Sequence, residues 1–308
     1  MILTPDMAPL SRNIEEYPEG IIIPIDKPYR WTSADVIRKV KYTAIRHFGK
    51  KNLKVGHAGT LDPLATGVLL VCIGKATKLA EELQSHDKEY VAGITFGATT
   101  PSYDLEKEID RFFPHEHITS AAVSEALPAF IGEQDQIAPL FSAKSVDGVR
   151  AYELARKLHK EGKTLDEAAE ELIRVSKINI TELELLKFTG GSVASDDPRP
   201  VPAALTHPLA GGGMSSPAIT ATEREETSNA SSRINVTDNS ALGLPRADVR
   251  MACSKGTYVR AFARDLGEAL GSGAHLDALQ RSRSGIFRVE NALTVDQAIA
   301  LLSAPNPL

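Results

Sequence analysis

The chain contains the stretch Gly56-His57-Ala58-Gly59-Thr60-Leu61-Asp62-Pro63-Leu64-Ala65-Thr66-Gly67, followed by the apolar run Val68 to Gly74. Such a run is typical of a buried strand. Glycine and proline restrict the shape of the loop before it, so Asp62 is expected to be fixed at the mouth of that strand. A carboxylate in that position suits a nucleophile or a general base. The alternative is an ordinary turn aspartate, because Asp-Pro also starts turns for local reasons.

The composition is that of an ordinary soluble globular protein. The 308 residues are 42% hydrophobic and 24% charged, which is enough for a core of normal size. Two cysteines, Cys72 and Cys253, show no C-x-x-C spacing, so neither a disulfide framework nor a zinc site is expected. Cys72 lies in an apolar run and is predicted to be a buried, reduced thiol.

No targeting or membrane segment is expected. The first residues lack a basic region followed by an apolar stretch, and no apolar run approaches ~18 residues. A cytoplasmic location is therefore predicted by elimination.

Basic residues are concentrated in the first third of the chain. Residues 21–90 hold 12 Lys and Arg against 7 Asp and Glu, although the whole chain carries a net charge of −5. A basic face, rather than a basic protein, is what phosphate binding requires. A solvated helix face with a basic loop is the alternative interpretation.

Periodicity predicts a mixture of strands and helices. Thr32 and Asp35 have capping-box spacing before a helical pattern that ends near Phe48. The expected strands are 20–26, 68–73, 88–97, 178–188 and 248–253, and the expected helices are 36–48, 75–84, 119–130, 151–159, 165–175, 257–270 and 292–302. Residues 1–18 are expected to form a loose extension, residues 133–149 a long loop and residues 304–308 a tail.

Residues 189–245 differ from the rest of the chain. They are rich in Ser, Thr, Ala, Gly and Pro and contain no aromatic residue, so they are predicted to be a disordered insertion. The strand expected at 248–253 could pair with 178–188, which would make the insertion an enlarged hairpin loop.

A second informative block, Cys253-Ser254-Lys255-Gly256-Thr257-Tyr258-Val259-Arg260, joins the last long strand to a helix. A guanidinium on the first turn of that helix could pair with a buried carboxylate and hold it ionised. An ordinary surface arginine is the alternative.

Both blocks resemble those of the TruB family of pseudouridine synthases. The first is Gly56 to Gly67 with Lys88-Glu89-Tyr90 after it, and the second is Cys253 to Arg260. Three weaker blocks also resemble the family pattern, and all five blocks follow one another along the chain in the order that the family has. The weaker blocks are Asp26-Lys27-Pro28, the run from Phe130 to Lys144, and Gly273-Ala274-His275-Leu276 with Leu279, Arg281 and Gly285-Ile286-Phe287. The resemblance covers roughly residues 20–188 and 246–303.

The chain also departs from the family pattern. Ala138 and Phe141 stand where a proline and a tyrosine are common, and the insertion 189–245 has no counterpart in that pattern. The chain ends near the core, so the small C-terminal RNA-binding domain of many relatives is not expected.

The resemblance implies an α/β fold of the α+β type. Its central sheet is mixed and mostly antiparallel, and helices flank it. The catalytic domain is expected at 19–188 and 246–303, with an RNA-gripping insertion at 133–165.

The resemblance further implies an isomerase that converts the T-loop uridine of tRNA, uridine-55, to pseudouridine after flipping it out of the RNA stack. No cofactor and no metal are expected, the partner is the tRNA T-arm, and the protein is expected to be a monomer without an obligatory protein partner. Asp62, Tyr90 and Arg260 are the expected catalytic residues: an essential carboxylate, a base-stacking ring and the cation that pairs with Asp62. The expected RNA-binding residues are His57, Lys27, Gly59, Thr60, Leu61, Lys144, Arg150, Arg156 and Lys255.

Some alternatives stay open at this point. Asp62 could attack the sugar or remove a proton from it. A tRNA-binding chaperone would use the same basic face without needing Asp62, Tyr90 and Arg260 together. A hydrolase with an aspartate nucleophile would need further carboxylates near Asp62, and Pro63, Leu64 and Ala65 offer none. A pseudouridine synthase with another RNA target is the nearest alternative.

Overall fold

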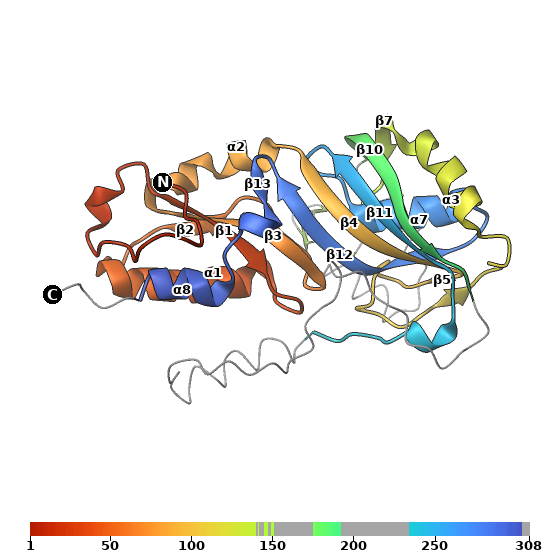
Figure 1. Ribbon diagram of the computed structural model, residues 1–308, viewed down its shortest axis with the longest axis horizontal. Coiled ribbons are helices and arrows are strands. Elements are labelled where there is room, and N and C mark those ends of the chain that lie inside the picture. The colour runs from red at the N-terminus through yellow and green to blue at the C-terminus, as the bar shows by residue number, and fades with distance from the viewer. Residues whose placement is uncertain (140, 142–144, 147–148, 151–174, 192–233, 304–308) are drawn as a thin grey trace. The chain divides into compact units, whose positions relative to one another are not determined.

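The computed structural model describes residues 1–139, 141, 145–146, 149–150, 175–191 and 234–303 (Figure 1). Its chain divides into two compact units. The first unit holds residues 1–89, Ile234 and 280–303, and the second holds the described residues from 90 to 191 and from 235 to 279. Two of the boundaries fall inside strands, β4 (Lys88–Phe96) and β12 (Ala274–Ser284). None of the described helices is long and apolar enough to cross a membrane.

Two strands of the first unit form an antiparallel pair. β1 (Ile21–Lys27) pairs with β3 (Ala65–Ile73), in a register that places Ile21 opposite Ile73 and Lys27 opposite Gly67. A third strand, β2 (Val55–His57), also pairs with β3 and places His57 opposite Val71. β3 is therefore flanked by β1 and β2, and all but one of its residues are buried.

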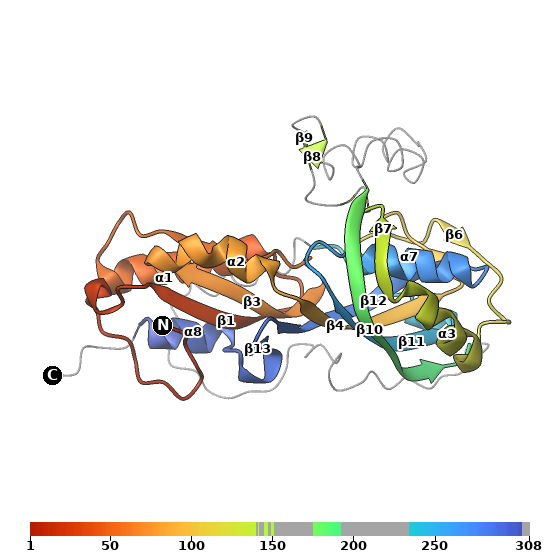
Figure 2. The same cartoon turned by 90° about the horizontal axis from the view of Figure 1, so that it is seen from above.

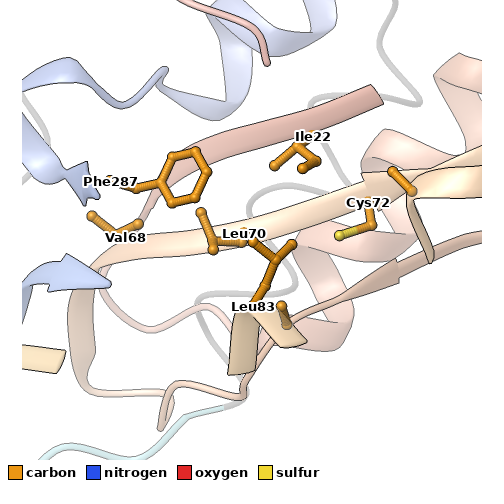
Figure 3. Close-up of a cluster of buried hydrophobic side chains, with 8 residues drawn as sticks. Ile22, Val68, Leu70, Cys72, Leu83 and Phe287 are labelled. Atoms are coloured by element: carbon orange, nitrogen blue, oxygen red, sulfur yellow. The ribbon is translucent and has the colours of Figure 1, made fainter. Parts of the chain in front are cut away.

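Alternation along β3 directs two sets of apolar side chains to opposite faces. Val68, Leu70 and Cys72 pack with Leu83 and Phe287 in one buried cluster (Figure 3). Cys72 is a free, buried thiol whose pKa is raised by burial to about 11, which confirms the expected reduced cysteine. Leu69, Val71 and Ile73, which alternate with that set, are also fully buried.

Helices flank this pair of strands. In Figure 1, α2 (Ala80–Ser85) lies on one side of β1 and β3, and α1 (Ser33–Phe48) and α8 (Val295–Leu301) lie on the other. Thr32 begins α1 with the predicted capping box, since its hydroxyl accepts from the Asp35 N–H and the Asp35 carboxylate accepts from the Thr32 N–H. Thr294 caps α8 in the same way with Gln297.

The second unit is built around long antiparallel strands. β10 (Ser176–Thr189) pairs with β11 (Arg246–Cys253) on one side and with β7 (Gly132–Gln136) on the other (Figure 2). The β10–β11 pair confirms the predicted pairing of 178–188 with 248–253. Its helices are α3 (Ser120–Ala126), capped by Thr119 as expected, and α7 (Val259–Ala269).

Short elements complete the two units. The short strands are β5 (Ala98–Thr99), β6 (Arg111–Phe112), β8 (Ser145–Val146), β9 (Val149–Arg150) and β13 (Phe287–Arg288), and the 3-10 turns are η1 (Ile14–Glu16), η2 (Gly74–Leu79), η3 (Leu127–Phe130), η4 (Ser240–Leu242) and η5 (Val289–Asn291). The strand pairs within each unit are antiparallel, and isolated parallel bridges join Ile2 to Ile22 and Ile25 to Leu293. The predicted mixed, mostly antiparallel fold with flanking helices is confirmed.

The structure corrects two expected elements and adds strands that the sequence did not predict. Residues 133–149 were expected to be a loop, but Glu133 to Gln136 belong to β7 because β10 supplies a pairing partner for their polar backbone. The helix expected at 75–84 is a 3-10 turn followed by the short α2. The strands β2 and β12 were not predicted.

The N-terminal segment is packed rather than loose. Leu3 is fully buried, its N–H donates to the Ile22 carbonyl, and the N-terminal amine donates to the Gly20 carbonyl. Leu10 is also buried and donates its N–H to Leu301. The expectation of a loose extension at 1–18 is wrong for this part of the chain. The segment around Leu3 hydrogen-bonds to the backbone of β1 and buries its apolar side chain.

Residues 189–191 and 234–245 of the predicted insertion 189–245 lie among the described residues. Its last residues contact the second unit, where Leu244 is 3% exposed and the Thr237 N–H donates to the Leu105 carbonyl. Residues 237 and 244 of the predicted insertion are therefore packed in the second unit, ahead of the expected boundary at residue 246. The helix expected at 151–159 and all but the last residue of the helix expected at 165–175 lie outside the described residues.

Candidate active site

The loop that carries Asp62 connects β2 to β3 in the first unit. The Ala58 N–H donates to the Leu70 carbonyl, so the loop leaves β2 still attached to β3. The Ala65 N–H then donates to the carbonyl of Asp62, which closes a turn just before β3. Asp62 itself is half-buried. The carboxylate therefore stands at the start of a buried strand, as the sequence predicted.

Arg281 of β12 holds the first half of this loop. Its side chain is 2% exposed, and its Nε donates to the Val68 carbonyl at 2.7 Å. Its two terminal nitrogens donate to the carbonyls of Thr60 at 3.3 Å and Gly59 at 3.2 Å. One planar guanidinium thus satisfies three carbonyls on both sides of Asp62 and fixes the loop against β3.

Gly67 permits the close packing of β12 on this loop. Its φ is +98°, and a Cβ placed there would lie 2.2 Å from the Arg281 carbonyl oxygen. The Gly67 N–H donates to the Asp26 carboxylate at 2.9 Å. Burial raises the pKa of Asp26, while this hydrogen bond and the neighbouring Lys27 lower it. A side chain at position 67 would push the loop away from Arg281.

Lys27 holds the second half of the loop. It is fully buried, and its Nζ donates to the carbonyls of Trp31 at 2.6 Å, Pro28 at 2.9 Å and Pro63 at 3.2 Å. The pKa of Lys27 is lowered to about 7, because the effect of burial exceeds the opposing effect of the negative charge of Asp62. These contacts favour a structural role for Lys27 over a direct contact with RNA phosphate, because the ammonium already faces three carbonyls.

Ser33 makes a further attachment beside Asp62. Its hydroxyl accepts from the Leu61 N–H at 2.9 Å and donates to the Leu61 carbonyl at 3.1 Å. Ser33 lies in the first turn of α1 and is 2% exposed. The residues on both sides of Asp62 are thus fixed by a strand, a helix and two buried cations.

His57 ends β2 and is half-buried. Burial lowers its pKa, and the positive charge of Arg281 lowers it further. Its Nδ1 is buried without a hydrogen-bond partner in the part of the chain that the structure describes. The imidazole is therefore neutral near pH 7 and is suited to stacking or wedging rather than to pairing with a phosphate.

The second unit holds the other expected catalytic residues. Tyr90 lies in β4 and is 9% exposed, and Arg260 lies in the first turn of α7 and is 6% exposed. Nη1 of Arg260 donates to the Ser102 carbonyl at 3.1 Å and lies 3.6 Å from the Asp104 carboxylate. Its Nη2 donates to the Phe141 carbonyl at 2.9 Å. Arg260 is thus a buried, positioned guanidinium and not an ordinary surface arginine.

Asp104 is fixed in turn by its own neighbours. Its carboxylate accepts from the Ser102 hydroxyl at 2.6 Å and from the Glu106 N–H at 3.0 Å. Asp104 is 4% exposed. These donors hold the Asp104 carboxylate 3.6 Å from Nη1 of Arg260, where it balances the charge of that guanidinium.

The segment before Phe141 is attached to α7 at several points. Gln136 exchanges two hydrogen bonds with the backbone of Tyr258, at 2.8 and 3.2 Å. Arg264, one turn after Arg260, donates to the Ile137 carbonyl at 3.2 Å and lies over the Tyr103 ring. The start of the expected RNA-binding insertion is therefore anchored to the same helix that carries Arg260.

The structure groups the predicted site residues into two sets. The first unit holds His57, Gly59, Thr60, Leu61, Asp62 and Lys27, and the second holds Tyr90, Arg260 and the exposed Lys255. Within the first set, Lys27 contacts the Asp62 loop because its Nζ donates to the carbonyl of Pro63, the residue after Asp62. The pairing of Asp62 with Arg260 joins the two sets and stays a prediction. Lys144, Arg156 and the side chain of Arg150 lie outside the described residues.

Two functional candidates were not singled out from the sequence. Arg281 was noted only as part of a motif, and Asp104 was not noted at all. Asp104 had no sequence signal, since it lies in an irregular loop 156 residues before Arg260. Across the described ranges, no cluster of His, Cys, Asp and Glu side chains is arranged to hold a metal ion.

Two protein-family models match this chain. Residues 46–195 match the model of the TruB family pseudouridylate synthase N-terminal domain. Residues 260–303 match the model of the tRNA pseudouridylate synthase B C-terminal domain, and this match falls on α7, β12, β13 and α8.

Curated relatives extend the match to most of the chain. The chain is 44% identical over 280 residues to a tRNA pseudouridine synthase B of Phocaeicola vulgatus, which covers 91% of this chain and 92% of that protein. It is 44% identical to a protein of the same name from Bacteroides thetaiotaomicron, with 90% of each chain covered. The corresponding protein of Thermus thermophilus is 39% identical, and the match covers 88% of this chain and 75% of that protein.

Solved structures share the fold at lower identity. A chain of a Cbf5-Nop10-Gar1 complex matches with a TM-score of 0.52 at 23% identity, and a chain of an H/ACA RNP bound to a substrate RNA matches with 0.51 at 20%. These matches cover 96% and 94% of this chain but only 58% and 56% of those chains. At such identity they support the fold alone. The family models and the curated relatives show that this chain belongs to the TruB family of pseudouridine synthases.

Proposed function

We propose that this protein is a tRNA pseudouridine synthase, an isomerase that converts the T-loop uridine at position 55 of tRNA to pseudouridine. The observation that carries the proposal is the fixed position of Asp62. Arg281 and Lys27 attach the loop on its two sides, in a chain whose relatives are named as enzymes of this activity. An ordinary turn aspartate does not require its loop to be held by two buried basic side chains such as Lys27 and Arg281.

The reaction conserves every atom of the nucleotide. The bond between C1′ of the ribose and N1 of uracil breaks, the uracil turns within the site, and a bond forms between C1′ and C5. A proton leaves C5 and a proton is gained at N1, so no oxidant, reductant or group donor is consumed. Asp62 starts the reaction, either by attacking the sugar or by removing a proton from it.

The surrounding residues have separate tasks in this proposal. Neutral His57 fills the space that the flipped uridine leaves in the RNA stack. Tyr90 stacks on the uracil, and its hydroxyl assists the late proton removal. Arg260 pairs with Asp62 and orients that carboxylate, while Asp104 balances the charge of Arg260.

The remaining partners follow from the same proposal. Exposed Lys255 contacts the RNA backbone, as do Lys144, Arg150 and Arg156 of the insertion. Gly59, Thr60 and Leu61 line the place where the nucleotide enters. The enzyme acts on the T-arm of tRNA as a cytoplasmic monomer, without an obligatory protein partner and without a cofactor.

The decisive experiment incubates the purified protein with an unmodified tRNA transcript and maps pseudouridine by chemical labelling and primer extension. We expect one stop, at the T-loop uridine. Asp62→Asn should abolish the stop and still bind the transcript, whereas Asp6→Asn, a change at an exposed aspartate, should leave the stop unchanged. A stop at another position would indicate a different RNA target, and no stop with tight binding would favour a tRNA chaperone.

A further inference from the structure

Arg30 has an unusual backbone beside the Asp62 loop. Its φ is +62°, a left-handed conformation that costs roughly 1–2 kcal/mol for a residue with a Cβ. The Arg30 N–H donates at 3.0 Å to the carbonyl of Pro63, the residue that follows Asp62. Glycine would adopt this conformation without strain. The chain therefore retains an arginine side chain here at a cost in stability, and such strain is found most often at functional sites.

The guanidinium of Arg30 makes a single hydrogen bond to the described residues. Its Nη2 donates at 2.7 Å to the carbonyl of Ile234, 204 residues away in the sequence. Its Nε is enclosed and has no hydrogen-bond partner among the described residues. Over the same residues, no carboxylate pairs with Arg30, although carboxylates pair with Arg38, Arg246 and Arg250.

Arg281 provides the instructive contrast. It satisfies three carbonyls of the loop and is almost completely buried. Arg30 is half-buried, keeps its positive charge uncompensated by a carboxylate in the described structure, and meets one neutral acceptor. A phosphate oxygen is a stronger acceptor for a guanidinium than a peptide carbonyl, and the planar fork of arginine suits it.

We propose that Arg30 is a phosphate-binding residue for the RNA substrate next to the Asp62 loop. The Ile234 carbonyl occupies Nη2 in the absence of RNA and gives way to a backbone phosphate when RNA binds. This inference rests on the proposed function, because it places an RNA strand at the Asp62 loop. The alternative is a purely structural role, in which Arg30 only fastens the chain at Ile234.

The backbone conformation makes a clean test possible. Arg30→Gly removes the guanidinium and relieves the positive φ, so the variant is expected to fold with a melting temperature within a few degrees of the parent. Arg30→Asn also tolerates this conformation and keeps a neutral side chain. Arg30→Lys keeps the charge without the fork. Arg288→Ala is the matched control, since it removes one positive charge from an exposed position of the same unit.

The readout is equilibrium binding of an unmodified tRNA transcript at several salt concentrations, with Asp62→Asn in every protein to prevent turnover. We expect Arg30→Gly and Arg30→Asn to weaken binding by about tenfold, the loss typical of one charge-assisted hydrogen bond. The slope of log Kd against log salt should fall by about one in both variants. Arg30→Lys should keep that slope and recover only part of the affinity.

The possible results distinguish failure of the proposed role of Arg30 from failure of the proposed tRNA activity. Affinity and salt slope that match Arg288→Ala would overturn the role of Arg30, even if the parent enzyme modifies the T-loop uridine. A fall in melting temperature with no change in salt slope would support the structural alternative and also overturn the inference. Failure of the parent enzyme to modify tRNA would instead contradict the proposed function.

Discussion

Nη2 of Arg281 donates to the carbonyl of Gly59 at 3.2 Å, although the two residues stand 222 positions apart in the sequence. The same side chain also reaches Thr60 and Val68. We predict that Arg281→Lys lowers the free energy of unfolding by about 1–3 kcal/mol, because one ammonium cannot reach all three carbonyls and leaves buried acceptors unsatisfied. Urea unfolding measures this loss, and single-turnover assays should show slower conversion of bound tRNA.

Arg283→Lys is the matched control for this prediction. Arg283 lies two residues further along β12 and is half-buried, and it donates to the Gly285 carbonyl, away from the Asp62 loop. Its substitution should leave the conversion rate of bound tRNA unchanged. Equal rates in the Arg281 and Arg283 variants would show that the loop keeps its shape without the Arg281 guanidinium.

The contact between Arg260 and Asp104 leads to a second prediction. Asp104→Asn keeps the size of the side chain but removes the charge that balances Arg260. We expect the conversion rate to fall at least about tenfold, the loss that accompanies one charge-assisted interaction, with little change in tRNA binding. Asp110→Asn, at an exposed aspartate of the same unit, is the control. A parallel loss of tRNA affinity would assign Asp104 to RNA binding rather than to the positioning of Arg260.

The sequence predicted the elements whose signals are local. The capping box of Thr32 and Asp35 depends on residues close together in the chain, and so does each of the two strands that form the β10–β11 pair. These signals survive folding because tertiary contacts reinforce them. The position of Asp62 at the mouth of β3 was predicted for the same reason.

β12 was missed because its polar residues are not on a solvent face. His275, Asp277 and Arg281 interrupt the apolar pattern, yet each has a dedicated partner: the Ala98 carbonyl, the Arg246 guanidinium and the loop carbonyls. Strand prediction from alternating apolar and polar residues assumes that the polar residues face solvent. It therefore misses a strand whose polar side chains hydrogen-bond to other parts of the protein. Asp104 escaped notice for the same reason, since its partner Arg260 is distant in the sequence.

The buried ammonium of Lys27 gives a prediction about pH. Burial lowers its pKa in the folded protein from 10.5 to about 7. Between these values the unfolded chain binds more protons than the folded protein, so the free energy of unfolding contributed by Lys27 rises as the pH increases from about 7. The slope of this contribution is at most ~1.4 kcal/mol per pH unit. Lys27→Met should therefore show a flatter stability profile between pH 7 and 9.

The comparison of the two proteins controls for other titrating groups. Groups such as the Cys72 thiol are shared by wild type and variant, so the difference between the two profiles isolates Lys27. Denaturant unfolding at half-unit pH steps provides both profiles. Parallel profiles would mean that Lys27 stays charged throughout this range and that its three carbonyl partners outweigh the cost of burial.

The N-terminal segment supplies the last prediction, and it tests the expectation that the structure overturned. Leu3 is fully buried, whereas the neighbouring Ile2 is 43% exposed, although both lie beside Ile22 of β1. Leu3→Ala should destabilise the protein by about 2–5 kcal/mol through lost burial and a residual cavity. Ile2→Ala should cost much less, because water already reaches that side chain. Urea unfolding distinguishes the two, and equal small losses would mean that residues 1–18 are a loose extension after all.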